Sequence, residues 1–284
     1  MITSVAFIIL NYKTFEDTVI LGKEILGFNI PNSVIVIVDN CSPNDSYQQL
    51  VNAFDSEPTV DVIASPVNGG YAKGNNLGLR YAKKYNPEYV CVINNDVHFT
   101  ADTISQLIND LKFNENVGAI APKQVLPNGE DVSVAFMKCV SFKDDLRGFV
   151  LTLPPKKIVY KATTDDGRLM KVGFVPGAFV FMKYAIAEKI DFYDESTFLY
   201  SEERFLSKRL EQIGLGCYID IKISYVHAHS KTIKGAIAYK NNRKLMLQSR
   251  RLFIERYYRH GKLKSAILGF LALAVINVKS LYHK

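Results

Sequence analysis

The chain has 284 residues, of which 48% are hydrophobic and 22% are charged, with 17 glycines and 10 prolines. This length and composition exclude a fibre, a disulfide-stabilised miniprotein and an intrinsically disordered chain, and they allow one large domain or two small ones. The formal net charge of +7 is compatible with nucleic acid, an anionic membrane or an anionic small substrate as the partner.

The positive charge is concentrated near the C-terminus. Residues 235–284 contain 11 Lys and Arg and one acid, whereas residues 1–234 contain 24 basic and 27 acidic residues. The sequence therefore predicts an acidic body over residues 1–234, at −3, and a basic tail over residues 235–284, at +10. The four cysteines are widely spaced and match no metal or disulfide pattern, so we expect reduced thiols in a cytoplasmic protein.

The first 121 residues alternate short apolar runs with longer amphipathic runs, which is typical of βα units in a mostly parallel sheet. The first apolar run is too short for a signal peptide and is expected to be a strand. Strands are predicted at residues 5–10, 34–38, 60–64, 89–93 and 117–121, and helices at 15–26, 46–54, 71–84 and 103–113. We expect Asp102 to be the N-cap of the last helix. Residues 1–121 would then form a Rossmann-like half, in which ligands bind at the carboxyl ends of the strands.

Polar side chains follow three of these strands where each strand ends. They lie in Asp39-Asn40-Cys41-Ser42, in a glycine-containing loop over residues 68–76, and in Asn94-Asn95-Asp96. Each segment alone has an ordinary explanation as a turn. Because three of them occupy equivalent positions, we expect a binding site at one edge of the sheet. The loop is not an ATPase P-loop, since Asn75-Asn76 stand where Lys and Ser or Thr are required, and the dinucleotide fingerprint is absent.

The second half of the body begins with residues 122–172, which lack clear periodicity and are expected to form irregular or hairpin structure over the sheet edge. A buried strand is predicted over residues 174–181 and a final strand over residues 223–226. Between them, a helix is expected to begin after Ser201 as its N-cap. Glu202 and Glu203 would lie in its first turn, where the helix dipole favours carboxylates.

The basic tail contains an apolar segment, residues 266–278, flanked by Lys and Arg. Thirteen residues are too few to span a bilayer but suit an interfacial or buried helix. We expect a helical hairpin on the anionic inner face of the membrane. The alternative is a helix pair packed on the body or on a second subunit, which leaves a homodimer open. Nucleic acid is not expected, because no binding motif accompanies the charge.

The ordered set of motifs resembles glycosyltransferase family 2, with the GT-A fold, and within it the rhamnosyltransferases and related enzymes of bacterial capsule and exopolysaccharide biosynthesis. The resemblance covers about residues 3–232. It rests on Asn11-Tyr12, Asp39-Asn40-Cys41-Ser42, the 68–78 segment, Asn94-Asn95-Asp96, Gly177-Ala178, Glu202-Glu203 with Arg209, and His227 before Ser230. It implies an α/β GT-A fold, in which residues 1–121 bind a nucleotide-sugar and residues 122–234 bind the acceptor.

The resemblance also implies roles for particular residues. Donor-binding residues would be Tyr12, Asp39, Asn68, Lys73, Asn75, Asn95 and Asp96. Among them, Asp39 would accept from a pyrimidine base on which Tyr12 stacks. Asp96 matches the last residue of an Asp-x-Asp motif that binds Mg²⁺ or Mn²⁺, although Asn94 replaces the first Asp. His227 would complete the metal or phosphate site, with His229 as a second candidate.

Glu203 stands where the family has the base that deprotonates the acceptor, and Glu202 is a rival for that role. The sequence thus predicts an inverting, metal-assisted transferase that moves a sugar, with rhamnose favoured, from a nucleotide-diphosphate donor to a lipid-linked cell-surface polysaccharide. The enzyme would be cytoplasmic and peripherally attached to the cytoplasmic membrane. Two alternatives stay open at this point: a catalytically silent nucleotide-sugar-binding subunit of an assembly complex, and a sugar nucleotidyltransferase.

Overall fold

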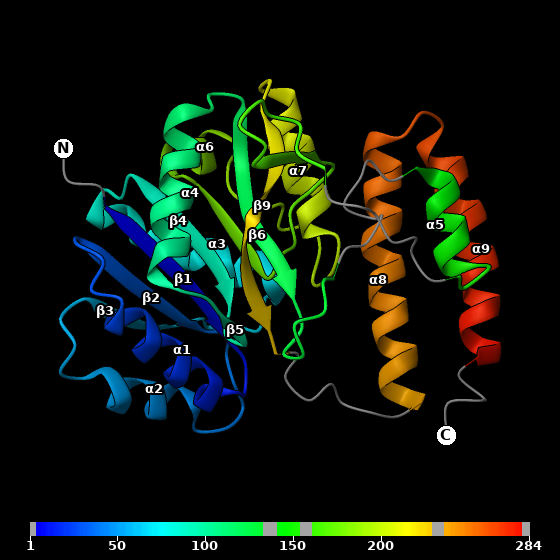
Figure 1. Cartoon of the computed structure of the whole chain (residues 1–284). Coiled ribbons are helices and arrows are strands. Elements are labelled where there is room, and N and C mark those ends of the chain that lie inside the picture. The colour runs from blue at the N-terminus through cyan, green and yellow to red at the C-terminus, as the bar shows by residue number, and fades with distance from the viewer. Residues whose placement is uncertain (1–3, 133–140, 154–160, 229–235, 280–284) are drawn as a thin grey trace.

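The protein is described by a computed structural model that covers residues 4–132, 141–153, 161–228 and 236–279 (Figure 1). A central sheet has helices on both faces, and a group of helices from the C-terminal part stands beside it. The three cysteines in the described residues, Cys41, Cys91 and Cys217, are free.

The N-terminal half of the sheet is parallel, in the order β3-β2-β1-β4. Its strands are β1 (Val5–Asn11), β2 (Ser33–Asp39), β3 (Val60–Ala64) and β4 (Tyr89–Asn94). Its helices are α1 (Phe15–Gly27), α2 (Ser46–Phe54), α3 (Gly70–Ala82), followed by the short η1 (Lys83–Tyr85), and α4 (Ala101–Phe113). These elements confirm the prediction, except that Thr100 is the N-cap of α4 and Asp102 lies in its first turn.

The second half makes the sheet mixed. β8 (Phe179–Lys183) runs antiparallel between β4 and β6 (Val117–Val125), and β9 (Gly216–His227) continues parallel to β6. Two short strands, β5 (Val97–His98) and β7 (Leu169–Val172), pair antiparallel with β9. Because β8 runs against β4, the residues before β8 arrive at the carboxyl end of β4, and the Asn94 backbone N–H donates to the Ala178 carbonyl (3.0 Å). The chain therefore returns to the predicted site edge.

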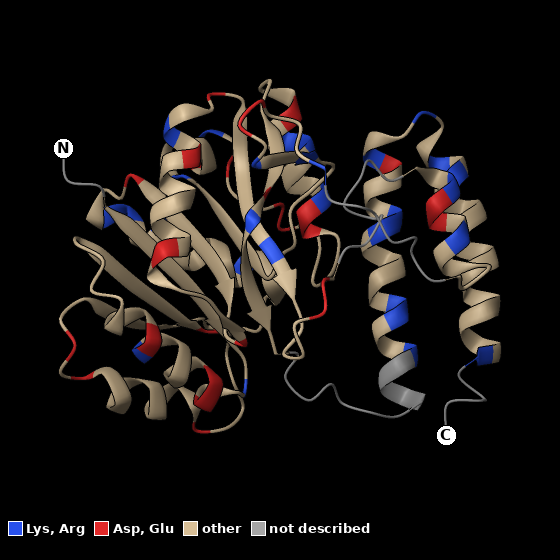
Figure 2. Ribbon diagram, in the orientation of Figure 1, with Lys and Arg blue, Asp and Glu red and all other residues tan. Residues whose placement is uncertain are grey.

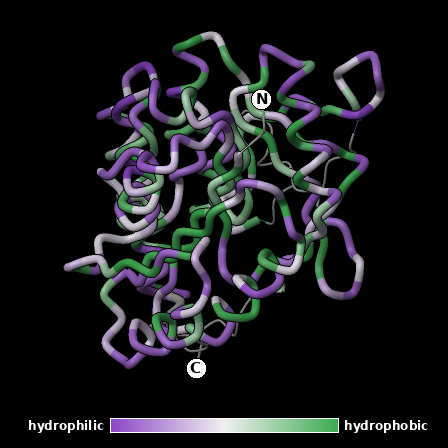
Figure 3. The backbone as a smooth tube through the Cα atoms, turned by 90° about the vertical axis from the view of Figure 1, so that its left-hand side faces the viewer, coloured by the Kyte–Doolittle hydropathy of each residue, from purple (hydrophilic) through white to green (hydrophobic). Residues whose placement is uncertain are grey.

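The sheet separates two apolar layers. Alternate residues of β1 divide between them, with Ala6 and Ile8 on one face and Phe7 and Ile9 on the other, all fully buried. The hydrophobic segments run through the middle of the molecule, where the strands lie (Figure 3). Each fully buried Ile or Phe contributes about 1.5–3 kcal/mol relative to exposure, so this core is a rigid base for the loops at the strand ends.

The expectation of irregular structure over residues 122–172 is wrong in part. β6 continues to Val125, α5 (Phe142–Phe149) has a capping box between Ser141 and Asp144, and β7 lies in the same segment. The predicted strand over 174–181 begins only at Phe179, because Pro176 has no N–H for a ladder and precedes a turn. The last predicted strand is the end of the longer β9. Helices α6 (Tyr184–Lys189) and α7 (Glu202–Gln212) complete this half.

The tail forms the predicted helical hairpin, α8 (Ala236–Tyr257) and α9 (Gly261–Lys279). Lys and Arg lie along α8 and at the two ends of α9, with few acids, whereas the body mixes both signs (Figure 2). Phe149 of α5 packs with residues of both tail helices in a separate apolar cluster. The apolar segment 266–278 lies within α9, which has 19 residues and is long and apolar enough, by length and composition alone, to cross a membrane. A third of its apolar window is buried within the protein.

Candidate active site

The ends of β1 and β2 are joined by their last residues. The Asn11 amide nitrogen donates to Asp39 Oδ2 (2.8 Å), and Asp39 Oδ1 accepts from the Ser42 backbone N–H (2.9 Å). Asp39 is only 2% exposed, so its carboxylate fixes the turn after β2. The Tyr12 ring beside this turn is 40% exposed and presents a surface for stacking, with Lys13 Nζ 5.0 Å from its centre.

The end of β4 joins the same polar network through neutral groups. Thr18 of α1 donates from its hydroxyl to the Asn11 side chain (2.9 Å). Asn95 donates to the hydroxyls of Thr14 (2.8 Å) and Thr18 (2.9 Å). Side chains therefore connect the ends of β1 and β2 with Asn95 after β4, so two of the three strand ends that the sequence places together, those of β2 and β4, share one network.

The glycine loop is attached to this edge through Asn68. Asn68 Oδ1 accepts from the Asn40 amide (3.0 Å) and from the Gly70 backbone N–H (3.1 Å). Lys73 is exposed, whereas Asn75 is buried and donates to the Tyr71 carbonyl within α3 (3.0 Å). Contacts of Lys73 and Asn75 with a donor stay predictions.

Gly70 is required where it stands. Its φ is +82°, and a Cβ there would lie 2.0 Å from the Phe198 carbonyl oxygen. The next residue, Tyr71, donates its backbone N–H to that same carbonyl (2.9 Å). The start of α3 thus contacts the segment that leads into α7, which carries Glu202 and Glu203.

Asp96 and His227 form a pair, because β5 follows Asp96 directly and pairs Val97 with His227. Asp96 Oδ1 lies 3.1 Å from His227 Nε2, and the side chains are 11% and 12% exposed. On the other side of the ring, Gln124 lies 3.1 Å from Nδ1 and accepts from the Tyr225 hydroxyl (3.1 Å). The contacts with Asp96 and Gln124 fix the orientation of the His227 imidazole. His229 lies outside the described residues.

Asp96 and His227 contact each other directly at 3.1 Å, and a carboxylate and an imidazole are both side chains that can bind a divalent cation. In the described ranges no group of three or more His, Cys, Asp or Glu could hold a metal alone. Mg²⁺ commonly binds through one or two protein carboxylates and completes its coordination with substrate phosphates and water. Asp96, with His227 beside it, therefore fits a metal that is bound together with a diphosphate. Partial burial is the main cause of the raised pKa of Asp17, and repulsion from the Asp96 carboxylate is the second cause.

Glu202 and Glu203 begin α7 and line one cavity of about 390 Å³. The cavity is also lined by Tyr71, Asn94, Gln124, Phe174, Gly177, Tyr193, Leu199, Tyr200, His227, Met246 and Arg250, among others. Glu202 is 5% exposed, and burial, followed by repulsion from Glu203, raises its pKa to about 8. Within the described part of the chain, Glu202 Oε1 has no hydrogen-bond partner. Glu202 is therefore mainly protonated at neutral pH.

Two tyrosines that sequence reasoning missed form a wall of this cavity. Tyr71 donates from its hydroxyl to the Gly177 carbonyl (2.6 Å), and its ring meets Tyr193 edge-on at 5.8 Å. Burial is the first cause that raises the pKa of both phenols, so both stay neutral. Tyr71 belongs to the 68–78 segment, and the sequence carries no signal of its place in the cavity, because a tyrosine on a helix is usually part of the apolar core.

The predicted residues fall into two groups. Asn94, Glu202, Glu203 and His227 line the same cavity, and Asp96 is paired with His227. Tyr12, Asp39 and Asn95 lie at the strand ends, where Asp39 and Asn95 form hydrogen bonds with neighbouring side chains and backbone. Asn68 lies between the groups, two residues before Gly70.

The model of the family described as glycosyl transferase family 2 matches residues 23–191, more than half of the chain. The chain belongs to this family. The low-salt glycan biosynthesis hexosyltransferase Agl10 of Haloferax volcanii is 28% identical over 219 residues, which are 76% of this chain and 65% of the relative. The chain thus spans slightly less than two thirds of that relative's length.

Solved structures share the α/β GT-A fold. The mannosyltransferase PcManGT from Pyrobaculum calidifontis, in complex with GDP-Man and Mn²⁺, has a TM-score of 0.62 at 14% identity, covering 96% of this chain and 73% of that one. TarS of S. aureus in complex with UDP-GlcNAc has a TM-score of 0.56 at 14% identity, covering 95% and 71%. These likenesses confirm the predicted fold class.

Proposed function

We propose that this chain is an inverting glycosyltransferase that moves a hexose-type sugar from a nucleotide-diphosphate donor to a glycan. The observation that carries the proposal is the cavity that Glu202 and Glu203 share with His227, the partner of Asp96. It offers a carboxylate base and a site for diphosphate-bound metal in one place. A hexosyltransferase relative in glycan biosynthesis and neighbours with bound GDP-Man or UDP-GlcNAc support the assignment.

Glu203 is the proposed base. A base must be ionised at working pH, and the pKa of Glu202, at about 8, leaves that residue mainly protonated at neutral pH. Glu203 lines the same cavity and is more exposed than Glu202. Glu203 would take the proton of the acceptor hydroxyl as that oxygen attacks the anomeric carbon, and the protonated Glu202 would keep a second negative charge away from it.

Asp96 and His227 would hold a divalent metal, Mg²⁺ or Mn²⁺, together with the donor diphosphate. Such an ion neutralises the charge that develops on the leaving group. The ring of Tyr12 would stack on the nucleobase of the donor. Asp39 would contact the same nucleobase while it accepts the hydrogen bond from Asn11. Asn68, Lys73, Asn75 and Asn95 remain proposed donor contacts of the ribose and diphosphate.

The finer assignments come from the motifs. We favour rhamnose as the donor sugar and a lipid-linked polysaccharide of the cell surface as the acceptor. The exposed side chains of α9 include Leu263 (63%) and Phe270 (79%), beside Lys262, Lys264 and Lys279. An apolar face with basic neighbours suits peripheral attachment to an anionic membrane. The protein would then work at the cytoplasmic face of the membrane, near such an acceptor.

A ligand screen tests the donor site. The full chain is heated with dTDP-rhamnose, GDP-mannose, UDP-GlcNAc or ATP, each with and without Mn²⁺. A donor at about 100 times its Kd stabilises the folded state by about 2.7 kcal/mol, which is a readable shift of the melting temperature. We expect a shift with one nucleotide sugar that is larger with Mn²⁺. Stabilisation by ATP alone, or by no nucleotide sugar, would contradict the proposal.

A further inference from the structure

The turn that precedes α7 has an unfavourable backbone. Tyr200 and Ser201 both have positive φ, 74° and 71°, which residues other than glycine rarely adopt. Ser201 is the N-cap of α7, but its side chain makes no capping hydrogen bond. Ser201 therefore occupies the predicted N-cap position, but its hydroxyl does not form the capping hydrogen bond. Contacts from outside α7 must hold the turn.

Two consecutive residues of α8 supply such contacts. The Ser249 hydroxyl donates to the Leu199 carbonyl (2.7 Å), and Ser249 is only 3% exposed. Arg250 Nε donates to the Ser201 hydroxyl (3.3 Å). Leu199 and Ser201 flank Tyr200, so α8 holds the left-handed turn on both sides.

Arg250 is itself fixed by a buried ion pair. Its guanidinium contacts Asp145 of α5, and Arg204 of α7 reaches the same carboxylate oxygen at 3.3 Å. The Asp145 side chain is 1% exposed. Because α5, α7 and α8 each contribute one member, this triad joins the tail to the helix that carries the proposed base.

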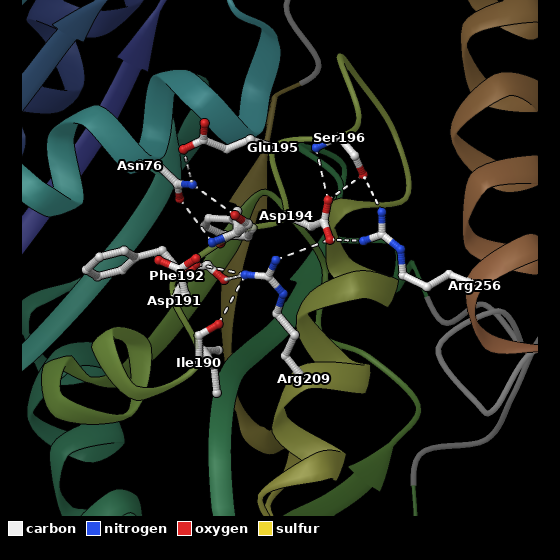
Figure 4. Close-up of polar contacts among 10 residues, drawn as sticks. Asn76, Ile190, Asp191, Phe192, Asp194, Glu195, Ser196, Arg209 and Arg256 are labelled. Carbon is white, nitrogen blue, oxygen red and sulfur yellow. Dashed lines mark hydrogen bonds and ion pairs between the residues drawn. The ribbon is translucent and has the colours of Figure 1, made fainter.

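A second acid with two arginines repeats the arrangement further along α8 (Figure 4). Asp194 is contacted by Arg256 of α8 and by Arg209 of α7 (3.2 Å). Arg209 also donates to the carbonyls of Ile190, Asp191 and Phe192. Helix α8 is thus attached to α7 at two points.

We infer that α8 is a working part of the catalytic centre and that Ser249 is a positioning residue for the Glu202-Glu203 turn. This inference rests on the proposed function. The segment 198–201 lies between two supports: Phe198 receives the N–H of Tyr71 at the start of α3, and Leu199 receives the hydroxyl of Ser249. Met246 and Arg250 of α8 also line the cavity. On this reading the tail, expected from sequence to attach the body to its surroundings, belongs to the site.

The test compares Ser249→Ala with Gln248→Ala, a matched control at the neighbouring exposed position of α8. A displacement of about 1 Å at a reacting group costs up to about 100-fold in rate. For Ser249→Ala we expect about a tenfold lower kcat, an unchanged KM for the donor and only a small fall in melting temperature, as for the loss of one hydrogen bond. Gln248→Ala should leave all three as in the wild type.

Hydrogen exchange of the peptide covering residues 198–206 is read in the same variants. We expect faster exchange there in Ser249→Ala and not in Gln248→Ala. Unchanged exchange would overturn the inference whatever the activity, and faster exchange with unchanged kcat would overturn the positioning role. If the wild type transfers no sugar while Ser249→Ala still shows faster exchange, the proposed function is wrong, but Ser249 still stabilises the turn before α7.

Discussion

The two sides of the site are built differently. At the strand ends, the neutral side chains of Asn11, Thr18 and Asn95 and the buried Asp39 carboxylate are joined by hydrogen bonds between neighbouring strands and α1. At the start of α7, the turn is held by Ser249 and Arg250 of α8, Arg250 is fixed by the buried Asp145, and a second buried acid, Asp194, joins α8 to α7. The first side depends on strand register and the second on tertiary ion pairs. They should therefore respond differently to mutation.

The largest expected effect is on the chemical step. Glu203→Gln removes the proposed base, and since a general base contributes about 10² to 10⁴-fold, kcat should fall about 1,000-fold. Donor binding should persist, because the strand ends are untouched. Glu203→Asp is the control, which keeps a carboxylate one methylene shorter. Steady-state kinetics measure kcat, and the shift in melting temperature with the donor measures donor binding. A normal kcat in Glu203→Gln would show that Glu203 is not the base.

Asp145→Asn tests the charged side through stability. Asn leaves Arg204 and Arg250 buried without their shared carboxylate, and breaking a buried ion pair in this way costs about 3–5 kcal/mol. Urea unfolding should show this loss. Asp55→Asn, at an exposed position after α2, should change stability by less than about 0.5 kcal/mol. Equal effects of the two substitutions would mean that the triad does not stabilise the fold.

Glu202 gives the stability a pH dependence with a definite sign. Its pKa rises from 4.5 to about 8 on folding, so between these values the native state holds a proton that the unfolded state has lost. Stability therefore falls as pH rises from about 5 to 8, by a few kcal/mol for this group. Glu202→Gln should flatten that slope in urea unfolding at several pH values. A slope that persists unchanged would locate the titration elsewhere.

Gly70 tests the junction between the two sides. Gly70→Ala and Gly129→Ala both place alanine at a φ of +82°, but only at Gly70 does the new Cβ meet an atom, the Phe198 oxygen. Backbone strain costs about 1–3 kcal/mol at either position. The contact should make Gly70→Ala the more destabilising substitution and should lower kcat as well. Melting temperatures and kinetics of the two variants separate the effect of the contact from that of the backbone strain. Equal losses of stability in both variants would show that the contact with the Phe198 oxygen has no effect of its own.

The smallest expected effect concerns the membrane. Phe270 on α9 is 79% exposed and Phe113 on α4 is 82% exposed, so the two phenylalanines are matched except in location. Phe270→Ser should weaken binding to vesicles with anionic lipid about tenfold, or about 1.4 kcal/mol, whereas Phe113→Ser should have no effect. Sedimentation with vesicles measures both. Equal binding of the two variants would remove α9 from the proposed membrane contact.

The same contrast explains what the sequence could predict. Strands and helices of the parallel half follow from local periodicity, and the site edge follows from polar residues at equivalent strand ends. The direction of β8, the placement of α5 against the tail and the attachment of Arg250 to Asp145 depend on contacts between residues about 100 positions apart. Spacing along the chain carries no signal for such pairs. In the sequence, nothing distinguishes Asp145 and Arg250 from charged residues on the surface.

The stereochemistry of transfer tests the central claim most directly. The purified full chain is given the donor selected by the melting screen, with Mn²⁺ and membranes as the source of acceptor, and the anomeric configuration of the product is determined by NMR. A single base, Glu203, acting in one displacement predicts inversion at the anomeric carbon, with product formed about 1,000-fold more slowly by Glu203→Gln. A product with retained configuration would contradict this account.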